Sequence, residues 1–144
     1  MKKVVKFGGS SLASAEQFRK VGSIIKADPE RRFVVPSAPG KRSRDDEKVT
    51  DMLYACYALA EEGSDFSEKL SAIRARYEEI IKGLSLKLSL DEEFQKIEEN
   101  FRNKAGKDYA ASRGEYLNGI VMAAYLKFPF IDAAEVIFFD EEGK

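Results

Sequence analysis

The sequence predicts an α/β fold in which a mostly parallel sheet is flanked by helices. Three short apolar runs carry this prediction: Val4–Phe7, Phe33–Val35 and Glu135–Phe139. They are rich in β-branched and aromatic residues, and segments with helical periodicity separate them. Strands that alternate with helices favour parallel pairing. Because a parallel sheet is normally larger and covered on both faces, three strands indicate an incomplete domain.

Composition excludes several classes of protein. The chain has 144 residues, of which 44% are apolar, and 24 basic side chains against 25 acidic ones leave a formal net charge of -1. There is no basic surplus to neutralise a phosphate backbone, no signal-peptide core, and no run near the ~20 apolar residues that span a bilayer. We therefore expect a soluble, cytoplasmic protein whose partners include neither nucleic acid nor membrane.

The counts of histidine and cysteine limit the chemistry. The sequence has no histidine, which removes Ser-His-Asp and Cys-His nucleophilic machinery and the commonest zinc ligand. The single cysteine, Cys56, lies in an apolar helical pattern, so we expect a buried, unreactive thiol in a reducing compartment. Any chemistry must use lysine, arginine, carboxylates, hydroxyls and backbone amides.

The first strand is expected to be buried and to stop at Gly8 and Gly9. A helix should follow, because Ser14 and Gln17 form a capping box and Pro29 forbids continuation of the helix. Strand, glycine turn and helix together make the first half of a βαβ unit.

The second strand must end near Pro36, since proline has no N–H to give to a sheet ladder. The charged stretch Lys41–Lys48 has no apolar pattern and predicts a mobile surface loop. An apolar stripe then predicts a helix over Glu47–Glu62, with Gly63 placed to act as its C-terminal cap.

Two further helices are predicted to form an antiparallel hairpin over about residues 65–103, set on the sheet domain. Asp65 with Glu68 opens the first helix, and Ser89 with Glu92 opens the second. A long helical pattern then covers Asp108–Lys127. Four of its residues are predicted to share one face: Leu117, Val121, Ala124 and Tyr125.

The turn after the first strand has the composition of an anion-binding loop. Lys6 supplies a positive charge, Gly8 and Gly9 let backbone N–H groups approach an anion, and Ser10 and Ser11 add hydroxyls just ahead of a helix. Phosphate binding is the natural hypothesis. The alternative is that two glycines after a strand serve only the geometry of a turn.

The established loop formulas do not fit this chain. A Walker A loop would need glycine where Val35 stands and serine or threonine where Arg42 stands, and no G-x-G-x-x-G occurs. Neither a P-loop NTPase nor a dinucleotide-binding enzyme is indicated.

Three other residues are candidates, each with a simpler alternative. Ser37 is a hydroxyl at the carboxyl end of the second strand, where open α/β sheets place ligands, but it could be a turn serine. Thr50 lies at the start of an apolar helix and could have a simple helix-end or capping role. Glu115 could be an exposed helical carboxylate, although Gly114 beside it suggests that some group approaches the backbone there.

The order of four motifs resembles the aspartate kinases of the amino acid kinase family. These motifs are K-F-G-G-S-S, V-V-P-S-A, V-T-D-M-L and S-R-G-E-Y-L. The resemblance covers the whole chain and implies the three-layer αβα sandwich of the amino acid kinase type, incomplete and with the helical hairpin as an insertion. Residues 1–144 would then be the N-terminal part of the catalytic domain. The family's later substrate-binding arginine and aspartate, its adenine-side loops and its C-terminal ACT domains have no counterpart here, so we expect residues 1–144 alone to be inactive.

The resemblance also implies roles for individual residues. The ATP phosphate grip would comprise Lys6, Phe7, Gly8, Gly9 and Ser10, with Lys6 as a catalytic residue. Ser37 would lie near the transferred phosphoryl group, and Thr50 and Glu115 would contact L-aspartate. Mg²⁺ would be bound through ATP rather than by the protein itself. The full-length enzyme would be a homo-oligomer.

The implied reaction forms 4-phospho-L-aspartate and ADP, the first step toward lysine, threonine and methionine. An aspartate carboxylate has a reference pKa of about 3.9, so at neutral pH it needs no general base. Phosphoryl transfer needs alignment and charge neutralisation, which lysine, backbone amides and Mg²⁺ can supply. Two alternatives stay open: an amino acid kinase with another acceptor, such as glutamate or acetylglutamate, and a non-catalytic interaction module built on the helical hairpin.

Overall fold

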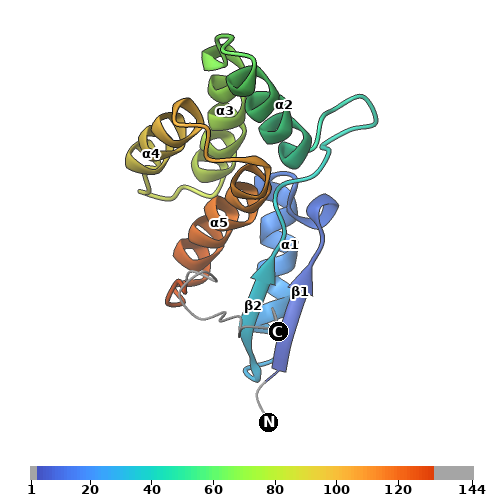
Figure 1. Cartoon of the computed structure of the whole chain (residues 1–144). Coiled ribbons are helices and arrows are strands. Elements are labelled where there is room, and N and C mark those ends of the chain that lie inside the picture. The colour runs from blue at the N-terminus through green and yellow to red at the C-terminus, as the bar shows by residue number, and fades with distance from the viewer. Residues whose placement is uncertain (1–2, 132–144) are drawn as a thin grey trace, which may run out of the picture.

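The computed structural model describes residues 3–131, which form a two-stranded sheet and a set of helices (Figure 1). The elements in chain order are β1 (Lys3–Phe7), the short 3₁₀ helix η1 (Gly9–Leu12), α1 (Ala15–Lys26), β2 (Arg31–Pro36), α2 (Val49–Glu61), α3 (Ser67–Gly83), α4 (Asp91–Arg102) and α5 (Lys107–Leu126). The third predicted strand, Glu135–Phe139, lies outside the described residues.

The two strands are parallel, as predicted for a βαβ unit. Partners run from Val4 opposite Phe33 to Phe7 opposite Pro36, and α1 makes the connection between the strands. The side chain of Ser14 caps α1 by accepting a hydrogen bond of 3.4 Å from the N–H of Gln17, which confirms the Ser14 cap of the predicted capping box.

The prediction that the first strand is buried holds for one of its faces only. Successive side chains of a strand point to opposite faces. Val5, Phe7 and Val34 pack against the helical core, whereas Val4 on the other face is 69% exposed and its partner Phe33 is 48% exposed. A short apolar run does not distinguish a strand covered on both faces from one covered on a single face.

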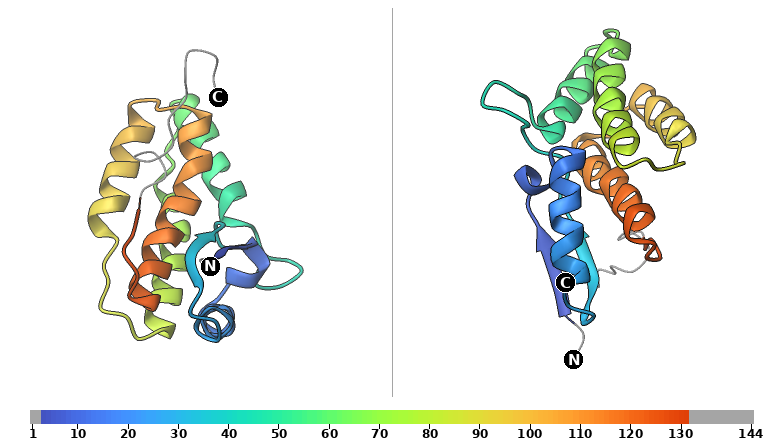
Figure 2. Two further views of the ribbon diagram at one scale, coloured as in Figure 1. Left: turned by 90° about the horizontal axis from the view of Figure 1, so that it is seen from below. Right: turned by 180° about the vertical axis from the view of Figure 1, so that it is seen from behind.

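Helices α2 to α4 form a layer at the end of the molecule beyond the carboxyl ends of the strands (Figures 1 and 2). Helices α3 and α4 run antiparallel, as predicted, but they pack mainly on α2 rather than on the strands. Aromatic edge contacts join this layer: the ring centroids of Phe66 and Phe101 are 5.8 Å apart. The hairpin therefore reaches the sheet mainly through α2, with a further contact between α3 and α1.

The residues predicted to mark the helix ends do so in the structure, two of them one residue from the expected position. Gly63 has a φ of +75°, and its N–H donates to the carbonyl of Ala60, which confirms the C-terminal cap of α2. Asp65 accepts a hydrogen bond from the N–H of Ser67, and Ser89 accepts one from the N–H of Asp91. Both side chains therefore act one residue ahead of the structural N-cap of their helix.

Helix α5 contacts α2 on one side and α1 with β2 on the other. Of the four residues predicted to share its buried face, Leu117 and Val121 are fully buried, but Ala124 and Tyr125 are half-buried. Because α5 has neighbours on two sides, its buried surface is wider than a single stripe and also takes in Gly114 and Asn118.

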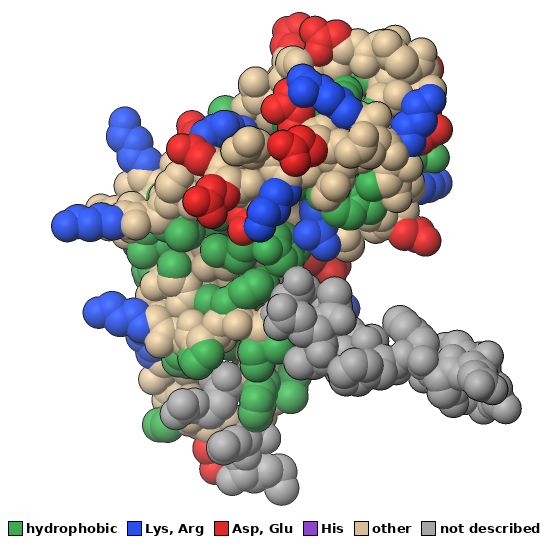
Figure 3. Space-filling view, turned by 60° about the vertical axis from the view of Figure 1, so that its left-hand side comes forward, with side chains coloured by type: hydrophobic (Ala, Val, Ile, Leu, Met, Phe, Trp, Pro, Cys, Tyr) green, Lys and Arg blue, Asp and Glu red, His purple; other side chains and the backbone are tan. Residues whose placement is uncertain are grey.

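Charged and hydrophobic side chains lie on different parts of the surface. On the face in Figure 3, charged side chains dominate the helical end, and hydrophobic ones gather on the end nearer the strands. The exposed large hydrophobic residues of the described chain include Val4, Phe33 and Val35 from the strands and Ile131 after α5.

Candidate functional site at the carboxyl ends of the strands

The loops that follow β1 and β2 meet at the carboxyl end of the sheet. The N–H of Gly40 donates a hydrogen bond of 2.8 Å to the carbonyl of Gly9, and the N–H of Ser37 donates one of 3.1 Å to the carbonyl of Phe7. The two glycines touch so closely that a Cβ on Gly40 would stand 2.6 Å from the carbonyl carbon of Gly9. No side chain fits there, so glycine at 40 is a requirement of the fold.

Gly8 differs from Gly9 in this respect. Its φ of -77° is open to any residue, and a Cβ built on it would meet nothing within 4 Å. A Cβ on Gly9 would stand 3.0 Å from the carbonyl oxygen of Ala38. Gly9 is therefore explained by packing within the chain, whereas Gly8 leaves exposed backbone that nothing in the described chain covers.

A short 3₁₀ turn separates the glycine turn from the helix that the Ser14 cap predicted. Ser10 and Ser11 lie within η1, whose tight turn is closed by the N–H of Ser11 donating to the carbonyl of Gly8. Helix α1 starts only at Ala15, and Ser14 occupies its N-cap. The positive end of the α1 dipole therefore does not adjoin Gly8, which follows β1 two residues after the exposed Lys6.

Ser37 lies at the carboxyl end of β2, as predicted, and is half-buried. Its carbonyl accepts a hydrogen bond of 2.7 Å from Nδ2 of Asn118 on α5. The following residues, Ala38 to Gly40, are buried. The carbonyl of Pro39 accepts a hydrogen bond of 3.0 Å from the N–H of Val49, so α2 begins directly against this loop.

Thr50 lies in the first turn of α2 and is half-buried. The N-cap of α2 is Lys48, so Thr50 is not the cap, although it does lie at the end of the helix as the alternative expected. Glu115 is exposed on α5.

The predicted close approach at Gly114 is confirmed. A Cβ there would stand 2.6 Å from the Cβ of Ala38, which belongs to the Ser37 loop. The hydroxyl of Tyr77 donates a hydrogen bond of 2.8 Å to the Gly114 carbonyl. Backbone contacts thus join the segments that carry Lys6, Ser37, Thr50 and Glu115 at one end of the sheet (Figure 1).

Sequence reasoning missed two buried polar side chains that support these loops. Asn118 is 0% exposed and Arg76 is 4% exposed. Nη2 of Arg76 donates a hydrogen bond of 2.6 Å to the Gly40 carbonyl, and Nη1 donates one of 2.8 Å to the Glu47 carbonyl. The available signal for Arg76 was its position between Ile73, Tyr77 and Ile80 on the apolar stripe of α3.

The charged stretch predicted as a mobile loop is in fact tied down. Arg42 forms an ion pair of 2.7 Å with Asp46 and one of 2.9 Å with Glu79 on α3. Its hydrogen bond holds the pKa of the Asp46 carboxyl well below the usual range, and the charge of Arg76, 3.6 Å away, adds to this. Burial and the nearby Arg42 lower the pKa of Arg76 from its ordinary value. Alternation of opposite charges within this segment provides internal pairing as well as solvation.

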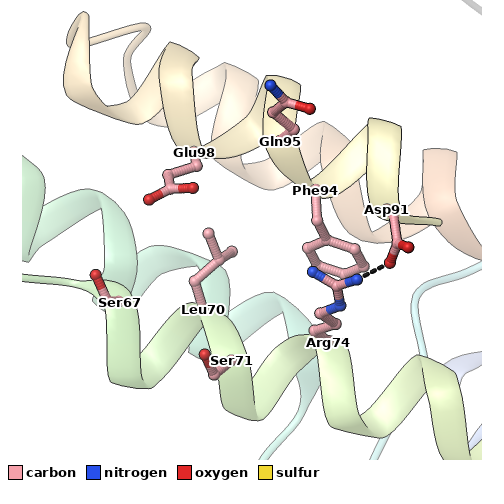
Figure 4. Close-up of a pocket in the computed structure, with 8 residues that line it drawn as sticks. All are labelled: Ser67, Leu70, Ser71, Arg74, Asp91, Phe94, Gln95 and Glu98. Atoms are coloured by element: carbon pink, nitrogen blue, oxygen red, sulfur yellow. Dashed lines mark ion pairs between the residues drawn. The ribbon is translucent and has the colours of Figure 1, made fainter.

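Two other features lie away from the strand-end loops. A groove of about 340 Å³ between α3 and α4 is lined by residues that include Ser67, Arg74, Asp91 and Glu98 (Figure 4). Cys56 is fully buried, and burial raises the pKa of its thiol to about 11, which confirms the predicted unreactive cysteine. Within residues 3–131, no helix has the length and apolar character needed to cross a membrane.

Comparisons with known proteins agree with the motif resemblance. The model of the amino acid kinase family matches residues 1–143. Aspartokinase 3 of Bacillus subtilis is 39% identical over 140 residues, covering 93% of this chain and 31% of that protein. The chloroplastic aspartokinase 1 of Arabidopsis thaliana is 30% identical over 133 residues, covering 85% of this chain and 23% of that protein.

Solved structures show the same likeness. The aspartate kinase of Clostridium acetobutylicum superimposes with a TM-score of 0.92 at 50% identity, over 98% of this chain and 32% of that one. Aspartokinase III of E. coli, in complex with aspartate and ADP, gives a TM-score of 0.70 at 27% identity, over 88% of this chain and 29% of that one. The chain thus spans about a third or less of the length of these relatives. The predicted α/β fold, an incomplete sandwich of the amino acid kinase type, is confirmed, and the chain belongs to the amino acid kinase family.

Proposed function

We propose that the protein carrying this chain is an aspartate kinase. It transfers the γ-phosphoryl group of ATP to the side-chain carboxylate of L-aspartate and releases 4-phospho-L-aspartate and ADP, the first step toward lysine, threonine and methionine. The similar proteins are aspartokinases, and one of the similar structures holds both aspartate and ADP. The single observation that carries the proposal within this chain is the backbone contact between Gly9 and Gly40.

That contact brings two candidate loops to one edge of the sheet. Ligands of open α/β sheets bind beyond the carboxyl ends of the strands, where loops from neighbouring strands meet. The first loop carries Lys6, Phe7, Gly8, Gly9 and Ser10, and the second carries Ser37. The two loops touch at Gly9 and Gly40, where no side chain separates their backbones. A phosphoryl group placed at this edge would lie within reach of both loops.

The first loop is the proposed grip on the ATP phosphates. Lys6 and Ser10 are exposed, and Gly8 leaves open space beside its backbone. A glycine that the fold does not require fits a position where phosphate oxygens approach the main chain. Lys6 then neutralises the charge that develops on the transferred group, which is the reason to name it as a catalytic residue.

The aspartate side of the site is proposed to consist of Thr50 and Glu115, with Ser37 next to the transferred group. Glu115 is an exposed carboxylate one residue from the Gly114–Ala38 contact, which suits it to bind the ammonium group of an amino acid. The first turn of α2 holds Thr50 next to the Ser37 loop through the bond between Val49 and Pro39.

The proposed chemistry needs positioning and charge neutralisation. The acceptor carboxylate is ionised at neutral pH and attacks the γ-phosphorus, while the bond from that phosphorus to the β,γ-bridging oxygen breaks and ADP leaves. Among residues 3–131, no group of three or more histidine, cysteine, aspartate or glutamate side chains could hold a metal ion. Mg²⁺ is proposed to bind through the phosphates of ATP, where it would neutralise oxygen charge.

Further parts of the proposal concern the whole protein. Residues 1–144 form the N-terminal part of the catalytic domain, with the hairpin of about residues 65–103 as an insertion, and the full-length enzyme is a cytoplasmic homo-oligomer. Size-exclusion chromatography with light scattering on the full-length gene product measures its mass, and a monomer would contradict the last point.

The test of the function is an assay of the full-length gene product with Mg-ATP and L-aspartate. Hydroxylamine traps the acyl phosphate as a hydroxamate, and release of ADP is followed in parallel. We expect both products with aspartate and neither with glutamate or acetylglutamate. Equal or faster reaction with another acceptor would favour the other amino acid kinases, and no reaction with any acceptor would favour a non-catalytic module.

A further inference from the structure

A buried arginine on the helical hairpin is connected to the proposed phosphate loop through a single residue. The carbonyl of Gly40 accepts from Nη2 of Arg76 at 2.6 Å, and the N–H of Gly40 donates to the Gly9 carbonyl at 2.8 Å. Gly40 thus carries one hydrogen bond toward α3 and one toward the loop that contains Gly8 and Ser10.

The same guanidinium also reaches the far end of the charged loop. Nη1 donates to the carbonyl of Glu47 at 2.8 Å, just ahead of α2. The planar fork of arginine fits two acceptors at once, which the single ammonium of lysine cannot match. Arg76 therefore fixes the separation between Gly40 and Glu47 and closes the loop between them.

Acidic side chains near Arg76 balance its buried positive charge. Its side chain is only 4% exposed, and Asp46 of the loop lies 3.6 Å away. Arg42 binds that same Asp46 and also Glu79, which lies one turn after Arg76 on α3. An unpaired charge in this position would be costly, and an apolar residue would suffice if the site only needed to be filled. The side chain is instead used to hold main-chain carbonyls.

We propose that Arg76 is a positioning residue for the phosphate-binding loop. Through the Gly40 peptide it holds the Gly9 carbonyl in place and so sets the orientation of the backbone that faces the ATP phosphates. This inference rests on the proposed function and assigns the hairpin a part in it. The start of α2 is also tied to the loop by the bond between Val49 and Pro39, so loss of Arg76 disturbs the nucleotide side more than Thr50.

The first test measures backbone hydrogen–deuterium exchange in the full-length gene product. We expect Arg76→Lys to speed exchange in peptides covering residues 7–12 and 37–48 and to leave those from α4 and α5 unchanged. Arg74→Met is the matched control, because Arg74 lies on the same helix and pairs with Glu78 and Asp91 away from both loops. Unchanged exchange in residues 7–12, or equally faster exchange everywhere, would overturn the proposal.

The second test measures steady-state kinetics of the same variants. Arg76→Lys should lower kcat/KM for Mg-ATP by about tenfold to 100-fold, because small misplacements of a positioned group have effects of this size. The KM for aspartate should change by less than about threefold, and Arg74→Met should match the wild type. Equal effects on both substrates would contradict the proposed route through Gly40.

The two tests separate this inference from the proposed function. If the wild-type protein shows no kinase activity, the function fails, while the exchange result still decides whether Arg76 holds the loop. Arg76→Gln, which keeps one side-chain donor, is the second variant. If neither variant folds, Arg76 serves stability of the fold as a whole, and the positioning role is rejected.

Discussion

The loops after β1 and β2 meet at one end of the sheet, but the chain holds them in different ways. The second loop is buried from Ala38 to Gly40, and Asn118, Arg76 and Val49 all bind its main chain. The first loop is exposed at Gly8 and Ser10, and the carbonyls of Phe7 and Gly9 beside them accept hydrogen bonds from the second loop. The difference indicates that one loop is a scaffold and that the other faces a ligand.

The largest effect is expected from Lys6, at the entrance to the exposed loop. Lys6→Ala in the full-length gene product should lower kcat by about 100-fold to 1000-fold, because a preorganised charge at the transferred group is lost. The KM for aspartate should change little. The control is Lys3→Ala on the same strand, which removes surface ion pairs with Asp28 and Glu30. Normal turnover of Lys6→Ala would show that the first loop is not the phosphate grip.

The next effect separates the two glycine positions. Gly40→Ala should lower the free energy of unfolding by about 1–3 kcal/mol, because its Cβ would overlap the backbone of Gly9. Gly8→Ala meets nothing within 4 Å and should leave stability within about 0.5 kcal/mol of the wild type while weakening use of Mg-ATP. Urea unfolding and steady-state kinetics measure the two quantities. Equal loss of stability in both variants would remove the distinction between scaffold and ligand-facing loop.

Glu115 provides the corresponding test of the aspartate side. Glu115→Ala should raise the KM for aspartate by about tenfold, the loss of one charge-assisted contact, with kcat changed much less. Stability should be unaffected, because this side chain is exposed. If Glu115→Ala and Lys6→Ala changed kcat and KM in the same proportions, separate roles for the two residues would be excluded.

The smallest effect concerns acid stability of the second loop. The folded-state pKa of Asp46 is lowered by Arg42, so its contribution is present above the unfolded pKa of about 3.9 and is lost as the pH falls toward the folded pKa. The unfolding free energy of the wild type should fall as the pH drops below about 4. Asp46→Asn should make this slope less steep, by at most about 1.4 kcal/mol per pH unit. Identical pH profiles would show that this ion pair does not support the loop.

The two loops also differ in how well the sequence predicts them. Local signals were sufficient for the first: the glycine turn and the Ser14 cap were predicted from neighbouring residues. The parallel pairing followed from the alternation of strands and helices. The prediction of Ser37 at a strand end followed from proline chemistry in the same local way. The 3₁₀ turn η1 ahead of Ser14 was not predicted, because a capping box does not show what precedes it.

The supports of the second loop could not be predicted, because they come from distant parts of the chain. Asn118 binds a carbonyl 81 residues earlier, and Arg76 binds one 36 residues earlier. No spacing rule links such pairs, and a charged residue on an apolar stripe shows only that some partner is needed. Gly114 came closest to a usable signal, since it predicted a close approach but not the identity of Ala38.

The decisive measurement is a crystal structure of the full-length gene product with Mg-ADP and L-aspartate. We expect phosphate oxygens within hydrogen-bond distance of the Gly8–Ser10 backbone and of Lys6, with the aspartate carboxylate directed at them from the side of Ser37 and Glu115. Phosphates bound elsewhere, with the Gly8–Gly9 turn directed away from both ligands, would contradict it.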